Sequence, residues 1–233
     1  MKTLHQHSWI DRIVHLLFIC VTLPFFACGQ PQAAHKKSEI SEEAMEKEKI
    51  ENSSKKSIDT ATFAAGCFWC VEAQFKELKG VQAVFSGFTG GKVPHPSYEA
   101  VCTGLTGHAE ACNIIFNPSE ISYDELLEAF FVAHDPTQLN RQGNDVGTQY
   151  RSAIFYHNDE QRKLAEYYIK RLDQEKAYTK PIVTQVRPFT VFYKAEDYHQ
   201  DYYANNGAQP YCQFVIKPKL DKFNKVFKEK LKH

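Results

Sequence analysis

A sharp change in composition near residue 58 limits how much of this chain can fold. Residues 29–57 contain almost no large apolar side chains and mix lysine with glutamate. Such a segment cannot bury enough apolar surface to offset the conformational entropy that is lost on ordering. We therefore predict that residues 28–57 form a disordered charged tether, and that the folded domain occupies residues 58–233.

A second boundary lies near residue 27. The apolar run from Ile13 to Ala27 follows two basic residues and has the length of a signal-peptide apolar region, which is short for a membrane span. Residues 1–27 are therefore predicted to be a signal peptide. Because Ala27 precedes Cys28, the junction resembles a bacterial lipoprotein cleavage site at which Cys28 is lipidated. An ordinary secretory cleavage and an uncleaved anchor are the alternatives.

Export and lipidation together predict a location in the cell envelope or periplasm, with a lipid anchor in a membrane. The chain carries 28 Lys and Arg against 28 Asp and Glu, so it has no basic excess for nucleic acid. Its seven cysteines are too few and too unevenly spaced for a disulfide scaffold. We expect a monomer that binds no nucleic acid.

Strand-like and helix-like patterns alternate after residue 57. Strands are predicted at 58–64, 81–88, 108–116, 151–157, 182–187 and 190–193, and helices at 68–78, after 122, after 158 and at 219–231. Ser122 and Glu125 form a capping box, and Asn158 is an N-cap. This order predicts an α+β fold, a two-layer sandwich with a mixed sheet and a split βαβ (ferredoxin-like) core, plus a long irregular C-terminal segment.

The sharpest local motif is the run Ala65-Gly66-Cys67-Phe68-Trp69-Cys70, where a predicted strand passes into a helix. A cysteine at a helix N-terminus faces unsatisfied N–H groups and the positive end of the dipole, which lower the pKa of its thiol. Cys67 is then a nucleophile, half of a thioredoxin-type dithiol with Cys70, or a buried small hydrophobe. A zinc site is disfavoured because no second closely spaced ligand pair is present, so no metal is predicted.

Six motifs in order resemble the A-type peptide-methionine sulfoxide reductase family. They are residues 64–69 (AAGCFW), 96–99 (PSYE), 106–110 (TGHAE), 134–137 (HDPT), 143–152 (GNDVGTQYRS) and 195–200 (AEDYHQ). Because the motifs are spread along the chain, the resemblance extends over nearly all of residues 58–220. The resemblance implies thiol-dependent reduction of methionine S-sulfoxide, free or in oxidised proteins, to methionine. It implies no bound cofactor.

The resemblance also implies which residues react. A sulfoxide sulfur is a poor electrophile until its oxygen is protonated, so the nucleophile needs a partner acid. Cys67 matches the family's nucleophile, which becomes a sulfenic acid. Glu110 matches the acid, and an apolar environment would have to raise its pKa to keep it neutral.

Five further residues match the family's substrate contacts. Tyr98 and Tyr150 match its hydroxyl donors to the sulfoxide oxygen, and Asp145 matches a carboxylate that assists through water. Phe68 and Trp69 match the pocket for the substrate's methyl group. The expectation for His199 is a structural or hydrogen-bonding role. Taken singly, each of these residues has an ordinary structural explanation.

The sulfenic acid has to be resolved by another thiol, and a thioredoxin-like protein is the expected electron donor. Cys212 lies after the last motif, where many relatives carry a resolving cysteine. Cys70 is one helical turn from Cys67 and is suited to a local disulfide. The sequence favours Cys212 slightly. Cys102 and Cys112 are predicted to be packing cysteines.

Two other functions remain open at this point. A general dithiol–disulfide oxidoreductase built on Cys67 and Cys70 would not need Glu110. A non-enzymatic lipoprotein binding module would use the aromatic pocket for recognition alone.

Overall fold

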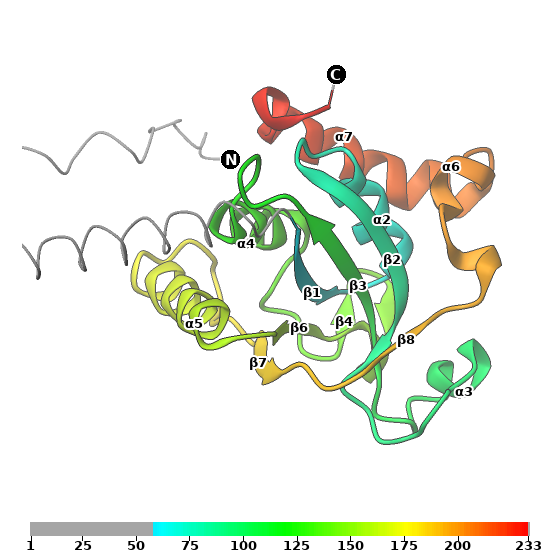
Figure 1. Ribbon diagram of the computed structural model, residues 1–233. Coiled ribbons are helices and arrows are strands. Elements are labelled where there is room, and N and C mark those ends of the chain that lie inside the picture. The colour runs from blue at the N-terminus through cyan, green and yellow to red at the C-terminus, as the bar shows by residue number, and fades with distance from the viewer. Residues whose placement is uncertain (1–57, 233) are drawn as a thin grey trace, which may run out of the picture. The chain divides into compact units, whose positions relative to one another are not determined.

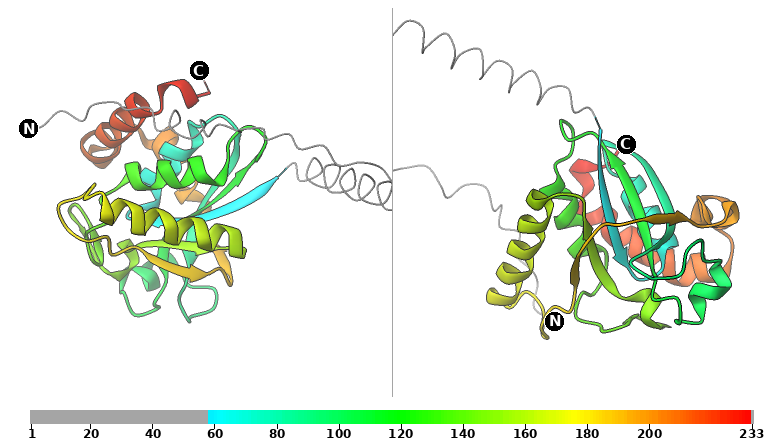
Figure 2. Two further views of the ribbon diagram at one scale, coloured as in Figure 1. Left: turned by 90° about the vertical axis from the view of Figure 1, so that its left-hand side faces the viewer. Right: turned by 60° about the horizontal axis from the view of Figure 1, so that its bottom comes forward.

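The computed structural model describes residues 58–232, and the predicted signal peptide, tether and Cys28 lie outside the described residues. The described part contains a six-stranded sheet in the order β7-β6-β1-β3-β2-β8 (Figure 1). Helices α4 and α5 lie side by side against this sheet (Figure 2). Within residues 58–232, no helix combines the length and the apolar character needed to cross a bilayer.

The strands confirm the predicted α+β class with a mixed sheet. They are β1 (Asp59–Ala65), β2 (Val81–Thr89), β3 (Ala109–Phe116), β6 (Ser152–Tyr156), β7 (Gln185–Pro188) and β8 (Phe192–Lys194). Neighbouring strands are antiparallel except for the parallel pair β6 and β7. In each of the units β1-α2-β2 and β3-α4-β6, one antiparallel strand separates the two strands of the unit.

The longer helices start close to the positions that the sequence predicts, but α7 ends at Val226, five residues before the predicted end at Leu231. They are α2 (Phe68–Lys76), α4 (Tyr123–Ala133), α5 (Asp159–Gln174) and α7 (Lys217–Val226). The capping box of Ser122 and Glu125 is present at the start of α4, and Asn158 caps α5 by accepting from Gln161. These helices were predictable because local hydrogen bonds and a repeating apolar face define them.

Several short elements are absent from the sequence-based prediction. They are the helices α3 (Tyr98–Cys102) and α6 (Tyr202–Asn206), the hairpin of β4 (Arg141–Gln142) and β5 (Asp145–Val146), the 3₁₀ turns η1 (Thr148–Tyr150), η2 (Asp197–His199) and η4 (Lys228–Lys230), and the π-helical turn η3 (Cys212–Ile216). None is long enough to show a hydrophobic period. Several of them carry the residues of the site described below.

The two faces of the sheet differ in the size of their side chains. The face under the helices carries the main core, which includes the fully buried rings of Phe63, Phe75 and Phe130. The other face carries a smaller cluster of Ala64, Ala109, Ala111, Ala153 and Phe155, covered in part by Phe189 and Phe192. Large apolar groups are therefore concentrated in one layer between sheet and helices.

Candidate active site

Cys67 lies at the N-cap of α2, two residues after β1 ends. The turn requires a glycine before it, because Gly66 has a φ of +90° and a Cβ there would lie 2.6 Å from the Cβ of Gln142. The side chain of Cys67 is 5% exposed and that of Cys70 is 3% exposed. The turn therefore holds both thiols in a nearly closed site.

The pKa of the Cys67 thiol is raised in this structure, so the lowered pKa that the sequence led us to expect is wrong. Burial is the largest cause, followed by the hydrogen bond that Cys67 donates to the sulfur of Cys70. Hydrogen bonds from the Tyr211 hydroxyl and the Trp69 backbone act in the opposite direction. Desolvation of a thiolate thus outweighs the favourable field at the start of α2.

Cys70 behaves in the opposite way. The hydrogen bond from Cys67 is the largest influence and lowers the pKa of Cys70, burial opposes it, and the charge of Lys219 lowers the pKa further. The Nζ atom of Lys219, on α7, lies 3.9 Å from the Cys70 sulfur. In the resting site, Cys70 is therefore the more easily ionised of the two thiols.

Glu110 on β3 is 1% exposed, and its Oε2 accepts a hydrogen bond from the backbone N–H of Phe68 over 3.0 Å. Burial, followed by the charge of Cys67, raises the pKa of Glu110 well above its ordinary value, and the hydrogen bond from Phe68 only partly opposes this. Its environment therefore favours the protonated form of the carboxyl group. This carboxyl group lies beside the residue that follows Cys67.

Two half-buried tyrosines face this acid from separate short elements. Tyr98 begins α3, and Tyr150 ends η1. Burial is the largest cause that raises the pKa of both phenols, and the charge of Glu110 also contributes to both. Both hydroxyls remain protonated and able to donate. Asp145, in the β4–β5 hairpin, accepts a hydrogen bond from Tyr211 over 2.8 Å.

Aromatic rings surround the cysteine. Phe68 is buried, and its ring stacks on Tyr98 with centroids 6.3 Å apart. Trp69 stacks on Tyr202 at 3.6 Å, and its Nε1 donates to Nδ1 of His199 over 3.1 Å. His199 therefore has the hydrogen-bonding position that the sequence suggested, with its ring 4.3 Å from that of Tyr98.

Two residues of the site were missed or misassigned from the sequence. Tyr211 contacts both Cys67 and Asp145 through its hydroxyl, yet its only sequence signal was its position next to Cys212. Cys102 is exposed at the end of α3, where the Tyr98 hydroxyl donates to its sulfur, so its prediction as a packing cysteine is wrong. The loop pattern around residues 90–97 concealed α3.

The other two cysteines are buried. The Sγ of Cys112 donates to the Phe68 carbonyl over 3.5 Å, which agrees with a packing role. Cys212 begins η3 and is fully buried; burial, followed by the charge of Cys67, raises its pKa. Cys212 is therefore close enough to Cys67 to sense its charge.

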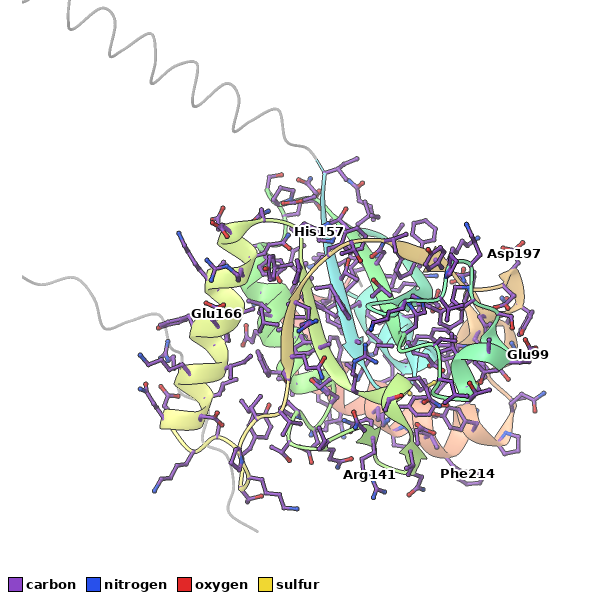
Figure 3. The ribbon with its side chains drawn as sticks, turned by 90° about the horizontal axis from the view of Figure 1, so that it is seen from below. Glu99, Arg141, His157, Glu166, Asp197 and Phe214 are labelled. Carbon is purple, nitrogen blue, oxygen red and sulfur yellow. The ribbon has the colours of Figure 1, made fainter. Side chains whose placement is uncertain are left out.

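The site lies on the side of the domain away from α5. Figure 3 shows Glu99 of α3, Arg141 of β4 and Phe214 of η3 on that side, whereas Glu166 of α5 lies at the opposite side. Within residues 58–232, no group of three or more His, Cys, Asp or Glu side chains is arranged to hold a metal ion.

A buried cysteine at a strand-to-helix turn, near a buried carboxyl group and two phenols, is typical of a thiol-dependent enzyme. The model of the peptide methionine sulfoxide reductase family matches residues 59–231. This chain belongs to that family, and it is an oxidoreductase that reduces methionine sulfoxide to methionine.

The chain is similar to relatives over most of their length. It is 57% identical over 175 residues to the peptide methionine sulfoxide reductase MsrA of Saccharolobus solfataricus, covering 75% of this chain and 98% of that one. The MsrA of Thermus thermophilus is 54% identical over 174 residues, with 75% and 98% covered.

Solved structures agree on the fold. The reduced form of Mxr1 from Saccharomyces cerevisiae superposes with a TM-score of 0.63 at 34% identity, covering 68% of this chain and 91% of that one. Methionine sulfoxide reductase A of Corynebacterium diphtheriae gives a TM-score of 0.59 at 36% identity, with 66% and 77% covered.

Proposed function

We propose that Cys67 attacks the sulfur of methionine S-sulfoxide while Glu110 gives its proton to the sulfoxide oxygen. The observation that carries this proposal is the buried Glu110, which accepts a hydrogen bond from the backbone N–H of Phe68, next to Cys67, in an environment that raises its pKa. The oxygen passes to the Cys67 sulfur as methionine leaves, the thiol proton of Cys67 replaces the one that Glu110 gave, and a sulfenic acid remains on Cys67. The cysteine is oxidised by two electrons and the substrate is reduced by two.

The surrounding side chains support recognition of the two substituents on the substrate sulfur. Tyr98 and Tyr150 supply protonated hydroxyls for the polar oxygen, and burial keeps both phenols from ionising. Phe68 and Trp69 supply an apolar wall for the methyl group, with Trp69 fixed by Tyr202. Because the oxygen, the methyl group and the direction of attack by Cys67 are then all fixed, only one epimer at the sulfur fits. The resemblance to the A-type reductases supports selectivity for the S epimer.

For the second step we propose Cys70 as the attacking thiol. Its sulfur displaces the hydroxyl of the Cys67 sulfenic acid, so that a Cys67–Cys70 disulfide forms and water leaves. Support comes from the hydrogen bond between the two thiols and from Lys219, which favours the Cys70 thiolate. Cys212, slightly favoured on sequence grounds, is the second candidate, and its electrostatic interaction with Cys67 supports it.

A thioredoxin-like dithiol protein is the proposed donor that reduces this disulfide. Because the overall cycle passes two electrons from a dithiol to a sulfoxide, it needs no bound cofactor.

We further propose that the enzyme is an exported monomer of the cell envelope or periplasm, with a lipid on Cys28. The apolar run before Cys28 supports this location. Mass spectrometry of the mature N-terminus tests it, and an unmodified residue other than Cys28 would reject lipidation.

Turnover of peptides that contain each epimer of methionine sulfoxide, with dithiothreitol as reductant, tests the catalytic proposal. We expect turnover of the S epimer alone and its loss in Cys67→Ser. Turnover of both epimers, or full activity in Cys67→Ser, would reject the proposal. A general disulfide reductase would instead reduce a disulfide substrate equally well with Glu110→Gln.

A single-turnover assay separates the two resolving candidates. With Cys70 as the resolving thiol, Cys70→Ser completes one stoichiometric reduction and then stalls with a thioredoxin donor, whereas Cys212→Ser continues. The reverse pattern would transfer the role to Cys212. Trapping of the Cys67 sulfenic acid by dimedone in the stalled variant shows which step has stopped.

A further inference from the structure

A second cavity lies on the face of the sheet that carries the smaller apolar cluster. Its volume is about 710 Å³. Its lining includes Gly90, Arg151, Phe155, Gln185, Arg187 and Thr190. None of these residues belongs to the thiol site described above.

Strand pairing explains why this face is hollow and polar at one end. Ala153 pairs with Gln185, and Phe155 pairs with Arg187, in the parallel register of β6 and β7. Because side chains alternate along a strand, these four residues point to one face of the sheet. Gly90 closes over this face so tightly that a Cβ would lie 2.6 Å from the Phe155 ring. The small residues Gly90 and Ala153 leave room for a cavity on this face, and Arg187 forms part of its wall.

The cavity contains two cations without a counter-charge. Arg151 is 9% exposed, and its guanidinium donates to the carbonyls of Thr148 over 2.9 Å and Gly107 over 3.0 Å. Within residues 58–232, neither Arg151 nor Arg187 forms an ion pair, and the cavity lining contains no Asp or Glu. Two carbonyls satisfy some of the five N–H donors of Arg151 and leave its positive charge uncompensated.

The two arginines also act on each other. Burial, followed by the charge of Arg187, lowers the pKa of Arg151. A buried cation beside a like charge is costly unless an anion is supplied, because its loss of hydration is not repaid by an attractive partner. A cavity that brings two guanidinium groups together without a carboxylate is thus electrostatically suited to an anion.

We propose that this cavity binds a small molecule that carries a phosphate or carboxylate group, held between the guanidinium groups of Arg151 and Arg187. Its volume falls within the range of about 300–1,000 Å³ that is typical of small-molecule sites. Gln185 and Thr190 add polar side chains at the wall, and Phe155 adds an apolar surface for the body of the ligand. The guanidinium fork matches two oxygens of either group.

Isothermal titration calorimetry on the full chain tests this site, with inorganic phosphate and citrate as separate probes at constant ionic strength. We expect one equivalent of at least one probe to bind. Arg187→Gln, an exposed position, should weaken that binding at least tenfold. Arg162→Gln, which removes the same charge from α5, where Arg162 pairs with Asp159 and Glu166 outside the cavity, should leave it unchanged. The difference between phosphate and citrate identifies the preferred anion.

Absence of binding by both probes would overturn the proposal. Equal binding by the unmodified protein and Arg187→Gln would also overturn it, because the anion would then bind elsewhere. Thermal unfolding without a probe checks the variant itself. Since Arg187→Gln removes a like charge from beside Arg151, its melting temperature at low salt should equal or exceed that of the unmodified protein.

Discussion

Oε2 of Glu110 accepts a hydrogen bond from the backbone N–H of Phe68, a residue 42 positions earlier in the chain, over 3.0 Å. The pairing of β1 with β3 produces this contact. Phe63 pairs with Cys112, and the same antiparallel register places Glu110 across from Ala65, where β1 ends. The acid is thereby held by backbone geometry at the residue that follows the nucleophile.

Glu110→Gln should lower kcat for methionine S-sulfoxide by about 10²–10⁴, the usual contribution of a positioned general acid. The amide keeps the shape and the acceptor for Phe68 N–H but has no acidic proton to give. Turnover with dithiothreitol measures the effect, and Glu160→Gln on the exposed face of α5 is the matched control. A loss of less than threefold would remove Glu110 from the proposed mechanism.

The same variant should change how stability depends on pH. Because the folded-state pKa of Glu110 lies above the ordinary value of 4.5, the folded protein binds a proton that the unfolded chain releases. That contribution is present at low pH and is lost as pH rises through the folded pKa, by at most about 1.4 kcal/mol per pH unit. Urea unfolding at pH 5 and pH 8 should therefore show the unmodified protein losing more stability than Glu110→Gln. Equal losses would mean that the folded-state pKa is not raised.

Gly66→Ala should destabilise the fold and slow the reaction. A positive φ alone costs an L-residue about 1–2 kcal/mol, and Gly143→Ala isolates that cost because a Cβ at Gly143 meets nothing within 4 Å. At Gly66 the added Cβ also collides with Gln142. We expect a larger loss in urea unfolding and a lower kcat for Gly66→Ala. Equal losses in the two variants would show that the Gln142 contact does not constrain the turn.

Lys219→Met should raise the pKa of Cys70 and slow formation of the Cys67–Cys70 disulfide at neutral pH. Removing the ammonium group removes an attraction that favours the thiolate. The pH dependence of Cys70 alkylation by iodoacetamide, in a Cys67→Ser background, reports the pKa directly. Lys219→Arg should largely restore it, and Lys222→Met on the exposed side of α7 should leave it unchanged. An unaltered alkylation profile in Lys219→Met would show that the lysine does not act on Cys70.

Local sequence signals were sufficient for the long elements. The capping box of Ser122 and Glu125 and the Asn158 cap are formed by residues a few positions apart, so α4 and α5 are visible without tertiary information. The strand-to-helix turn at Cys67 was equally visible, since glycine and the change of period lie in one short run. The α3 helix and the β4–β5 hairpin were missed because they are too short for a period.

Some residues of the candidate site could likewise be predicted from the sequence, whereas other contacts in it could not. The motifs that contain Cys67, Glu110 and Tyr150 indicated the chemistry, because they occur together and in the order of a known enzyme family. The position of Tyr211 against Asp145, and that of Lys219 against Cys70, depend on how the C-terminal segment packs onto α2.

By itself, then, the amino-acid sequence determined the class of fold through its local patterns, and it indicated the proposed nucleophile and acid through six motifs that resemble one enzyme family. Only the tertiary structure decided which thiol ionises more easily, and which two cations line one cavity. The pKa of Cys67 depends on burial by distant segments, and the repulsion between Arg151 and Arg187 depends on the pairing of β6 with β7. Desolvation and Coulomb energies depend on burial and on distances in three dimensions, so a local stretch of sequence does not determine them.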